Sequence, residues 1–408
     1  MNKKKIINDP VYGFITLHSE LIFDILSHRH FQRLRHIKQL GLTDYVYPAA
    51  LHTRFQHALG AMHLMGKALE TLRFKGVEIS ADEFEASQIA ILLHDIGHGP
   101  FSHALEDALI PGINHESLSY LFMDRMNKDL RGALDLTLKI FRNSYPRKFF
   151  HHLVSSQLDI DRLDYLKRDS FFTGVQEGTV GVDRIISMLN VHQDQLVVEE
   201  KGIYSIESFL NARRLMYWQV YLHKTTVSTE RMLVNLIRRA QTLVRAGETL
   251  PASEALLTFL EKDLTHSDFK ENPGILNLFG QLDDNDIWGA VKFWKDHDDV
   301  ILSLLSKMML ERRLFKIKLS AEPIRKNQID LIRNAVVKQY KIRRSEAPYL
   351  FSHGTVSNEA YAEGKEINIL MQSGEVLDIA QASDLPNIKA LSKIVKKNYL
   401  CWPKNVSL

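Results

Sequence analysis

Residues 94–103 read HDIGHGPFSH, and three of these ten residues are histidines. His94 and His98 are four positions apart, so they share one face of a helix, and Asp95 follows His94 directly. Gly97 is typical of a helix that ends in a turn. An imidazole and a carboxylate at such a helix end can bind one divalent metal ion, provided that further ligands converge from other elements.

Two further residues complete a ligand set. His57 begins a predicted helix, and Asp161 lies in an acidic run. Two imidazoles and two carboxylates leave positions open for water and substrate, as in catalytic metal sites. A His-Asp pair alone is weak evidence for a metal site. The same chain has a second pair, His297-Asp298, which has no second histidine nearby and is predicted to lie on a solvated helix surface.

The composition is that of an ordinary globular protein. The 408 residues include 52 Lys+Arg and 49 Asp+Glu, a net charge of +3, with 45% hydrophobic and 25% charged residues. The single cysteine, Cys401, excludes an internal disulfide. No apolar run reaches the roughly 18 residues of a membrane span, and the N-terminus lacks the apolar core of a signal peptide. We expect a cytoplasmic protein without membrane contact.

Helical periodicity dominates the chain. Ser80 and Glu83 form a capping box before an apolar helix that should end near Gly97. The other expected elements are helices over 54–72, 153–167, 205–222 and 228–246, and hairpins over 196–204 and 367–377. The sequence predicts a mainly α fold with a smaller α+β C-terminal lobe. We expect a core over 1–230, a helical extension over 231–310 and the lobe, with a regulatory role, over 311–408.

The order of the motifs resembles the HD-domain deoxynucleoside triphosphate triphosphohydrolases. Four runs carry this resemblance: FQRLRHIKQLG (31–41), RFQHALG (54–60), HDIGHGPFSH (94–103) and DRLDYLKRD (161–169). It is strong over about residues 5–230 and weak in the tail. The resemblance implies a helical HD-domain core that hydrolyses dNTPs to deoxynucleoside and inorganic triphosphate.

The resemblance also implies roles for individual residues. The implied metal ligands are His57, His94, Asp95 and Asp161. The implied acid–base residues of the phosphate pocket are His98, His103 and His115, with the carboxylates Glu106 and Glu116 beside them. An imidazole transfers protons near neutral pH, which supports these roles. Histidines that only pack or cap remain the alternative.

Cations and aromatic residues are implied to hold the nucleotide. The residues that match the triphosphate clamp are Arg54, Arg162, Arg213 and Lys224. Those that match the sugar contacts are Gln39, Tyr165, Asp169 and Tyr221, and Tyr217 joins the substrate-binding set. The residues from Arg213 through Tyr217 and Tyr221 to Lys224 recur at helical steps, which predicts one shared helix face.

A second nucleotide site is implied near the N-terminus, at Lys5, Asn8, Arg33 and Arg35. Ser27 stands where the family has an acidic residue that reads guanine, so guanine specificity is not implied. Mixed imidazole and carboxylate ligation suits Fe, Mn, Ni, Zn or Co, and additional Mg²⁺ is expected only with the nucleotide. The family commonly forms dimers and tetramers, which implies a homo-oligomer.

Two other functions stay open. HD-type nucleases and phosphodiesterases are similar, but many of them have lysine shortly after the His-Asp pair, where this chain has His98. A nucleotide-sensing binding protein would use the same pocket without turnover. Basic residues between Arg312 and Arg344 suit effector phosphates or nucleic acid, although a solvated helix face is the favoured interpretation and nucleic acid is not a favoured partner.

Overall fold

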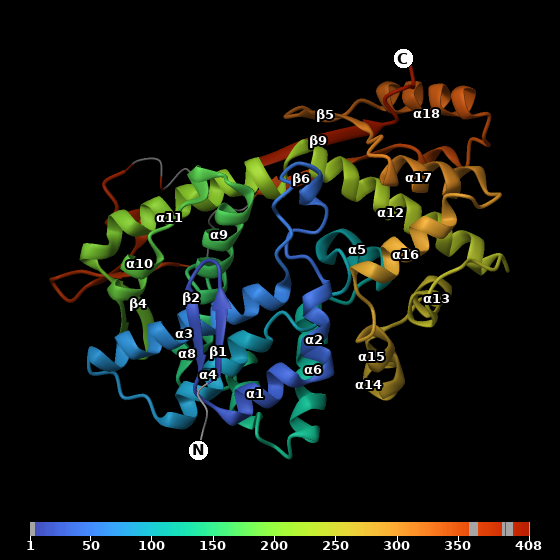
Figure 1. The fold of residues 1–408 in the computed structure, drawn as a ribbon. Coiled ribbons are helices and arrows are strands. Elements are labelled where there is room, and N and C mark those ends of the chain that lie inside the picture. Colours follow the sequence, from blue (N-terminus) through green and yellow to red (C-terminus); the bar gives the residue numbers. More distant parts are fainter. Residues whose placement is uncertain (1–4, 359–365, 386–387, 389–394, 408) are drawn as a thin grey trace.

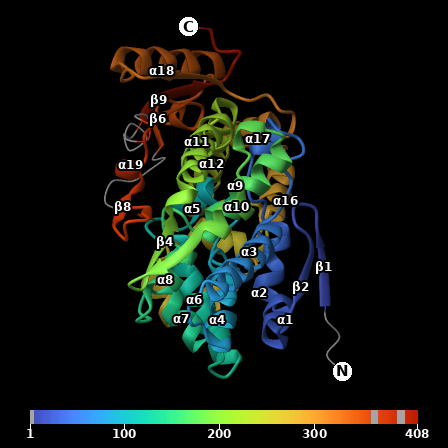
Figure 2. The same cartoon turned by 90° about the vertical axis from the view of Figure 1, so that its left-hand side faces the viewer.

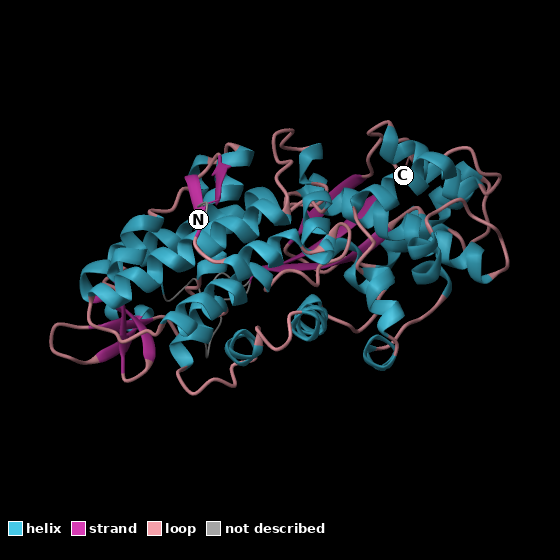
Figure 3. Cartoon of the chain, turned by 60° about the horizontal axis from the view of Figure 1, so that its bottom comes forward, coloured by secondary structure: helices cyan, strands magenta, loops and turns pink. Residues whose placement is uncertain are grey.

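The computed structural model describes residues 5–358, 366–385, 388 and 395–407, and helices dominate it (Figures 1 and 3). It opens with a hairpin of β1 (Lys5–Asp9) and β2 (Gly13–Leu17) and the short helices α1 (Glu20–Ser27) and α2 (Arg29–Gln32). The helices that follow are α3 (Arg54–Phe74), α4 (Ala81–Leu93), α5 (Ser102–Leu109), α6 (His115–Asp129), α7 (Asp135–Phe141), α8 (Lys148–Val154), α9 (Ile160–Thr173), α10 (Val182–Met188), α11 (Ile203–Met216) and α12 (Lys224–Arg245).

The later elements are α13 (Glu254–Glu261), α14 (His266–Glu271), α15 (Pro273–Phe279), α16 (Asp284–Trp294), α17 (Val300–Leu310), β5 (Lys316–Ser320), α18 (Lys326–Tyr340), β6 (Ser352–Asn358), β7 (Asn368–Leu370), β8 (Val376–Asp378), α19 (Ile379–Ala382) and β9 (Val395–Trp402). Strands β5, β9 and β6 form an antiparallel sheet, which lies with α18 at the end of the molecule away from α4 and α6 (Figure 2). The mainly α fold with a smaller α+β tail is therefore confirmed.

Helix α3 is the central element of the first half of the chain. Buried residues occur on every side of it, as expected for a helix that other helices surround. It packs against α4 and α9, and glycines make these contacts close. A Cβ on Gly66 would lie 2.8 Å from the Gln88 side chain on α4, and a Cβ on Gly60 would overlap Asp164 and Arg168 on α9.

Two predicted elements were wrong. The helix expected over 153–167 is two helices, because Asp159 caps α9: its carboxylate accepts from the backbone N–H groups of Ser156 and Arg162, each at 2.8 Å. The hairpin expected over 196–204 instead pairs β4 (Gln195–Glu199) with the preceding β3 (Leu189–His192). Its turn uses Gln193 and Asp194, which both adopt positive φ.

Other predictions from local sequence are confirmed. The Ser80–Glu83 capping box begins α4, with Glu83 N–H to Ser80 Oγ at 3.1 Å and Ser80 N–H to Glu83 Oε2 at 2.8 Å. The second hairpin is β7–β8, and β7 pairs in parallel with β4, so the tail returns to the first half of the chain. The expected division at residue 230 falls within the continuous helix α12, which contacts α5, α13 and α17.

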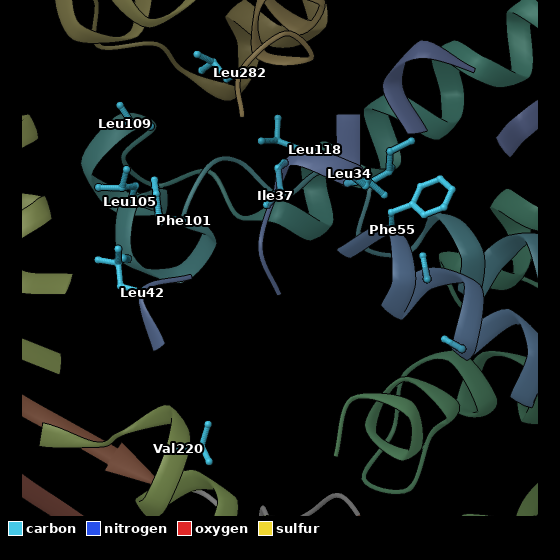
Figure 4. Close-up of a cluster of buried hydrophobic side chains, with 14 of the residues drawn as sticks. Leu34, Ile37, Leu42, Phe55, Phe101, Leu105, Leu109, Leu118, Val220 and Leu282 are labelled. Atoms are coloured by element: carbon cyan, nitrogen blue, oxygen red, sulfur yellow. The ribbon is translucent and has the colours of Figure 1, made fainter. Parts of the chain in front are cut away.

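A buried apolar cluster surrounds the segment that follows α4. Figure 4 shows Phe101, Leu105 and Leu109 near Leu34 and Leu118, with Leu282 above them. This packing fixes the segment that carries the His-Asp motif against α5 and α6. In the described part of the chain, no helix combines the length and apolar character that a membrane crossing requires.

A substitution at Gly97, in the segment that carries the His-Asp motif, tests this packing. A Cβ there would overlap the backbone of His115, Leu118 and Ser119 on α6. Main-chain atoms cannot rotate away, so Gly97→Ala should destabilise the protein by about 3 kcal/mol, the upper end for overpacking. Gly99→Ala is the matched control, because its Cβ would meet only the Phe279 ring, at 3.1 Å. Urea unfolding should show a loss of less than about 1 kcal/mol for this control. Equal losses in the two variants would contradict the account.

Candidate active site

Three helical segments bring the predicted metal ligands together. His57 comes from α3, His94 and Asp95 follow α4, and Asp161 is the second residue of α9. Oδ1 of Asp161 lies 3.1 Å from Nε2 of His57 and 3.3 Å from Nε2 of His94. Oδ1 of Asp95 lies 3.3 Å from Nε2 of His94. Ligand atoms of His57, His94 and Asp161 all lie within 4.8 Å of one another.

The other ring nitrogen of each histidine is hydrogen-bonded. Nδ1 of His57 lies 2.7 Å from Oδ2 of Asp164, and Nδ1 of His94 lies 2.6 Å from the carbonyl oxygen of Ile91. Both acceptors fix a proton on Nδ1 and aim Nε2 at Asp161, the arrangement of metal-binding histidines. Among the described residues, the two buried Nε2 atoms have no hydrogen-bond partner. Ligands bound at right angles, about 2.1 Å from one ion, lie roughly 3.0 Å apart, which fits the observed spacing.

The charges at this cluster favour a cation. Burial raises the pKa of Asp161, but His57 and His94 outweigh it and hold the pKa below its usual value. The pKa of Asp95 is also lowered, because His94, His98 and its ion-pair partner Arg54 outweigh burial. Burial lowers the pKa of His57, whereas the neighbouring carboxylates of Asp161 and Asp164 raise it to about 10. A proton on His57 therefore occupies the place that a bound metal ion would take.

A second group lies beside these ligands. Nε2 of His98 is 3.3 Å from Oδ1 of Asp95, and the rings of His98 and His115 stack with centroids 3.8 Å apart. Burial and the nearby Arg54 hold the pKa of His98 far below its usual value, so its ring is neutral at physiological pH. Glu106 accepts from the backbone N–H of His115 at 2.9 Å and lies 3.2 Å from its Nδ1.

Two further residues were predicted for this group. Glu116 is exposed on the first turn of α6, and it acts electrostatically on His151. The side chain of His103 lies outside the described residues, although its backbone belongs to α5. Among the described side chains, the structure therefore brings together His98, His115 and Glu106.

Aromatic and acidic residues line the other side of the cluster. Asp169 is buried and accepts from the Tyr221 hydroxyl at 2.8 Å, while Nε2 of His52 lies 2.6 Å from its second oxygen. The Tyr165 ring packs edge-on against Tyr221 at 6.1 Å and lies 6.5 Å from the His57 ring. Tyr165 thus separates the metal ligands from the Asp169–Tyr221 pair.

The predicted cations are only partly brought together. Arg162 pairs with Asp159, and Nη1 of Arg213 donates to Gln157 at 2.8 Å. Both arginines act electrostatically on the Tyr165 hydroxyl, whose pKa is raised chiefly by burial. The expected single helix face was wrong, because a π-helical turn over Tyr217–Tyr221 ends α11 and Lys224 begins α12 as an exposed residue.

The residues expected at a second nucleotide site lie in different surroundings. Arg33 is 5% exposed, and its guanidinium donates to the carbonyl oxygens of Ile96, His98 and Leu282 at 2.8–3.0 Å. Its assignment to nucleotide binding was wrong, because these bonds hold the motif segment in place.

The other three residues of that site are at the surface. Lys5 and Asn8 are exposed on β1, and the Lys5 ammonium lies over the Phe23 ring. Arg35 is also exposed, with its guanidinium 3.6 Å from the centre of the Phe55 ring. These three residues therefore remain accessible to a ligand.

Known proteins share both the motifs and the fold. An HD domain matches residues 54–169, and an HD associated region matches residues 180–265. A crystal structure of a phosphohydrolase from Bacteroides thetaiotaomicron superposes with a TM-score of 0.95 at 53% identity, covering 98% of this chain and 100% of that one. The Bacillus subtilis protein YwfO is 32% identical over 421 residues, which is 100% of this chain and 94% of its own length. The chain belongs to the HD-superfamily phosphohydrolases.

One relative of this HD phosphohydrolase has a more specific name. The deoxynucleoside triphosphate triphosphohydrolase SAMHD1 homolog of Dictyostelium discoideum is 29% identical over 288 residues. That match covers 66% of this chain and 56% of the relative. The superfamily makes the chain a hydrolase, and the predicted metal ligands His57, His94, Asp95 and Asp161 lie within the matched HD domain.

Sequence reasoning missed two residues of the HD phosphohydrolase site. Asp164 orients His57, and His52 orients Asp169 while it stacks on Phe172 at 4.5 Å. The spacing of Asp164 from Asp161 along α9 offered a signal for the first. His297 lies in the turn between α16 and α17, where its Nδ1 accepts from the Asp299 N–H at 3.0 Å, so it is not on a helix surface.

Metal content tests the assignment of the ligands. His94→Ala removes one converging nitrogen and should lose most of the transition metal that the purified protein retains after dialysis. His297→Ala makes the same change in the other His-Asp pair and should keep the wild-type content. Inductively coupled plasma mass spectrometry gives metal per chain. Retention of metal by the His94 variant, or an equal loss in both variants, would contradict the assignment.

Proposed function

We propose that this HD phosphohydrolase converts dNTPs to deoxynucleoside and inorganic triphosphate at one divalent transition metal ion. The observation that carries the proposal is the position of the cluster of His57, His94, Asp95 and Asp161. It lies between the stacked His98–His115 pair and the Tyr165–Tyr221 pair. A phosphate at the cluster would have imidazoles on one side and a surface for the sugar on the other. The similarity to the Dictyostelium relative, which is named a deoxynucleoside triphosphate triphosphohydrolase homolog, supports the same reaction.

The chain's own residues bind and orient the triphosphate. A bound ion supplies Lewis acidity and lowers the pKa of water. Arg54, Arg162 and Arg213 are each held by a carboxylate or amide partner, so each guanidinium is oriented before the nucleotide arrives. Planar guanidinium groups suit phosphate oxygens and spread their positive charge over them.

Protonation of the leaving 5′-oxygen is assigned to an imidazole of the second group. His115 is the described candidate, because the Glu106 carboxylate beside its Nδ1 would stabilise the charged ring. His98 is neutral and buried, which suits a hydrogen-bond donor or acceptor towards phosphate. His103 remains a further candidate for this proton transfer, because it belongs to the motif at residues 94–103.

Sugar recognition is assigned to Asp169, Tyr165, Tyr221 and Gln39. Asp169 is oriented by His52 and Tyr221 and offers a rigid acceptor for the 3′-hydroxyl. Oε1 of Gln39 is buried and has no hydrogen-bond partner among the described residues, so a substrate hydroxyl would satisfy it. The Tyr221 ring would exclude a 2′-hydroxyl sterically. Tyr217 packs against Tyr221 at 5.2 Å and holds that ring in place.

An activating nucleotide is the regulatory part of the proposal. Lys5, Asn8 and Arg35 are exposed, so Lys5 and Arg35 would supply positive charge for it and Asn8 an amide group. Mg²⁺ would enter with the nucleotides. A homo-oligomer, either a dimer or a tetramer, would be the activated form.

The reaction is tested by product analysis on metal-loaded protein. Each of the four dNTPs and four NTPs is supplied alone and in pairs, and products are separated by ion-exchange chromatography. We expect deoxynucleoside and triphosphate from dNTPs only. Pyrophosphate with dNMP would overturn the proposed bond cleavage, and turnover that begins only with a second nucleotide would establish activation.

The sugar selection is tested at Tyr221. Tyr221→Ala removes the ring and should lower the preference for dATP over ATP, measured as the ratio of kcat/KM values, by roughly tenfold or more. Tyr221→Phe keeps the ring and loses only the bond to Asp169, so its preference should stay within about threefold of wild type. Unchanged preference in the alanine variant would show that another residue excludes the 2′-hydroxyl.

A further inference from the structure

A chain of buried charges connects the N-terminal hairpin to the metal ligands. Asp9 ends β1 and is 4% exposed. Its Oδ1 accepts from the backbone N–H groups of Val11 at 2.9 Å and Tyr12 at 3.0 Å. Its Oδ2 accepts from Nη1 of Arg168 on α9 at 2.8 Å. Oδ1 therefore shapes the turn of the hairpin and also receives a longer contact of 3.4 Å from Nη2 of Arg168, whereas the shorter contact of Arg168 is to Oδ2.

Arg168 carries the contact onward. Its side chain is fully buried, with Nε donating to Oδ2 of Asp164 at 2.9 Å and Nη2 to Oδ1 at 3.0 Å. This two-bond contact fixes the plane of the Asp164 carboxylate. Oδ2 of the same carboxylate lies 2.7 Å from Nδ1 of His57. The order of contacts is thus Asp9, Arg168, Asp164 and His57.

Helix α3 leaves space for this series of charged side chains. Gly60 lies one turn after His57, and a Cβ there would overlap Oδ1 of Asp164 and Nη2 of Arg168 and lie 2.9 Å from the Tyr12 ring. The guanidinium of Arg168 also lies 5.5 Å from the centre of that ring. Gly60 and Tyr12 therefore confine the charged groups, and little freedom remains for any one to move alone.

We propose that Asp9, on the N-terminal hairpin, is a positioning residue of the metal site and acts on His57 through Arg168 and Asp164. The proposal rests on His57 being a metal ligand, as in the proposed function. Two carboxylates share the charge of Arg168. Without the charge of Asp9, the guanidinium would draw the Asp164 carboxylate away from His57. A weaker acceptor on Nδ1 makes Nε2 a poorer metal ligand.

The test uses Asp9→Asn, which separates the two functions of the side chain. The amide oxygen can still accept from Val11 and Tyr12, whereas the amide nitrogen would face Arg168 and end the ion pair. Binding of Co²⁺ is followed by its visible absorption, which requires no substrate. We expect the Co²⁺ dissociation constant to rise roughly 3–10-fold for Asp9→Asn and about 10–100-fold for Asp164→Asn.

The matched control is Asp299→Asn. Asp299 also accepts from a backbone N–H, that of Leu302 at 2.8 Å, and also pairs with a largely buried arginine, Arg239. It lies at the start of α17 in the second half of the chain. The Co²⁺ affinity of the Asp299→Asn variant should stay within about twofold of the wild-type affinity. Equal affinities for the Asp9 and Asp299 variants would overturn the proposal and leave Asp9 as a support of the hairpin only.

A double variant tests whether Asp9 acts on the metal site through Asp164. If Asp9 acts through Asp164, adding Asp9→Asn to Asp164→Asn should weaken Co²⁺ binding by less than about twofold more. Additive losses would contradict the route. If Asp9→Asn does not fold, Arg168→Lys replaces it, because lysine keeps the charge but cannot contact both carboxylates in this geometry. Wild-type affinity in that variant would likewise overturn the proposal. A protein that binds Co²⁺ in this way but does not hydrolyse dNTPs would contradict the proposed function alone.

Discussion

The hydrogen bond between Asp164 and His57 joins α9 to α3, two of the three helical segments that form the cluster. The Asp164 side chain is fully buried, and burial of a carboxylate is tolerated only where strong partners compensate for lost hydration. Arg168 and His57 supply that compensation from α9 and α3. The same packing brings Nε2 of His57 within 3.1 Å of Asp161. The contact that makes the core stable therefore also places one metal ligand from each helix.

A second set of contacts holds the segment that carries Asp95 and His98. Arg33 donates to its carbonyl oxygens from one side, and the backbone of α6 packs on Gly97 from another. From the C-terminal side, the Asp284 carboxylate accepts from the Phe101 N–H at 2.9 Å. Burial raises the pKa of Asp284 to about 6, although the hydrogen bond from the Phe101 N–H lowers it. Helices of the expected extension thus complete the active-site scaffold.

Local sequence predicted what depends on local physics. The capping box at Ser80, the β7–β8 turn and the motif at residues 94–103 each rest on neighbours within a few positions. The contacts of Asp164 with His57 and of His52 with Asp169 join residues 107 and 117 positions apart, so no periodicity could indicate them. The resemblance placed Arg33 at a second nucleotide site, whereas its partners, the carbonyl oxygens of Ile96, His98 and Leu282, are likewise distant in sequence.

The central claim is that His57, His94, Asp95 and Asp161 form one metal site in this HD phosphohydrolase. Anomalous diffraction from crystals grown with Mn²⁺ tests it most directly. We expect one strong peak within about 2.4 Å of Nε2 of His57, Nε2 of His94 and one carboxylate oxygen from each of Asp95 and Asp161. A peak held only by Asp95, His98 and His115, or no peak near these residues, would contradict it.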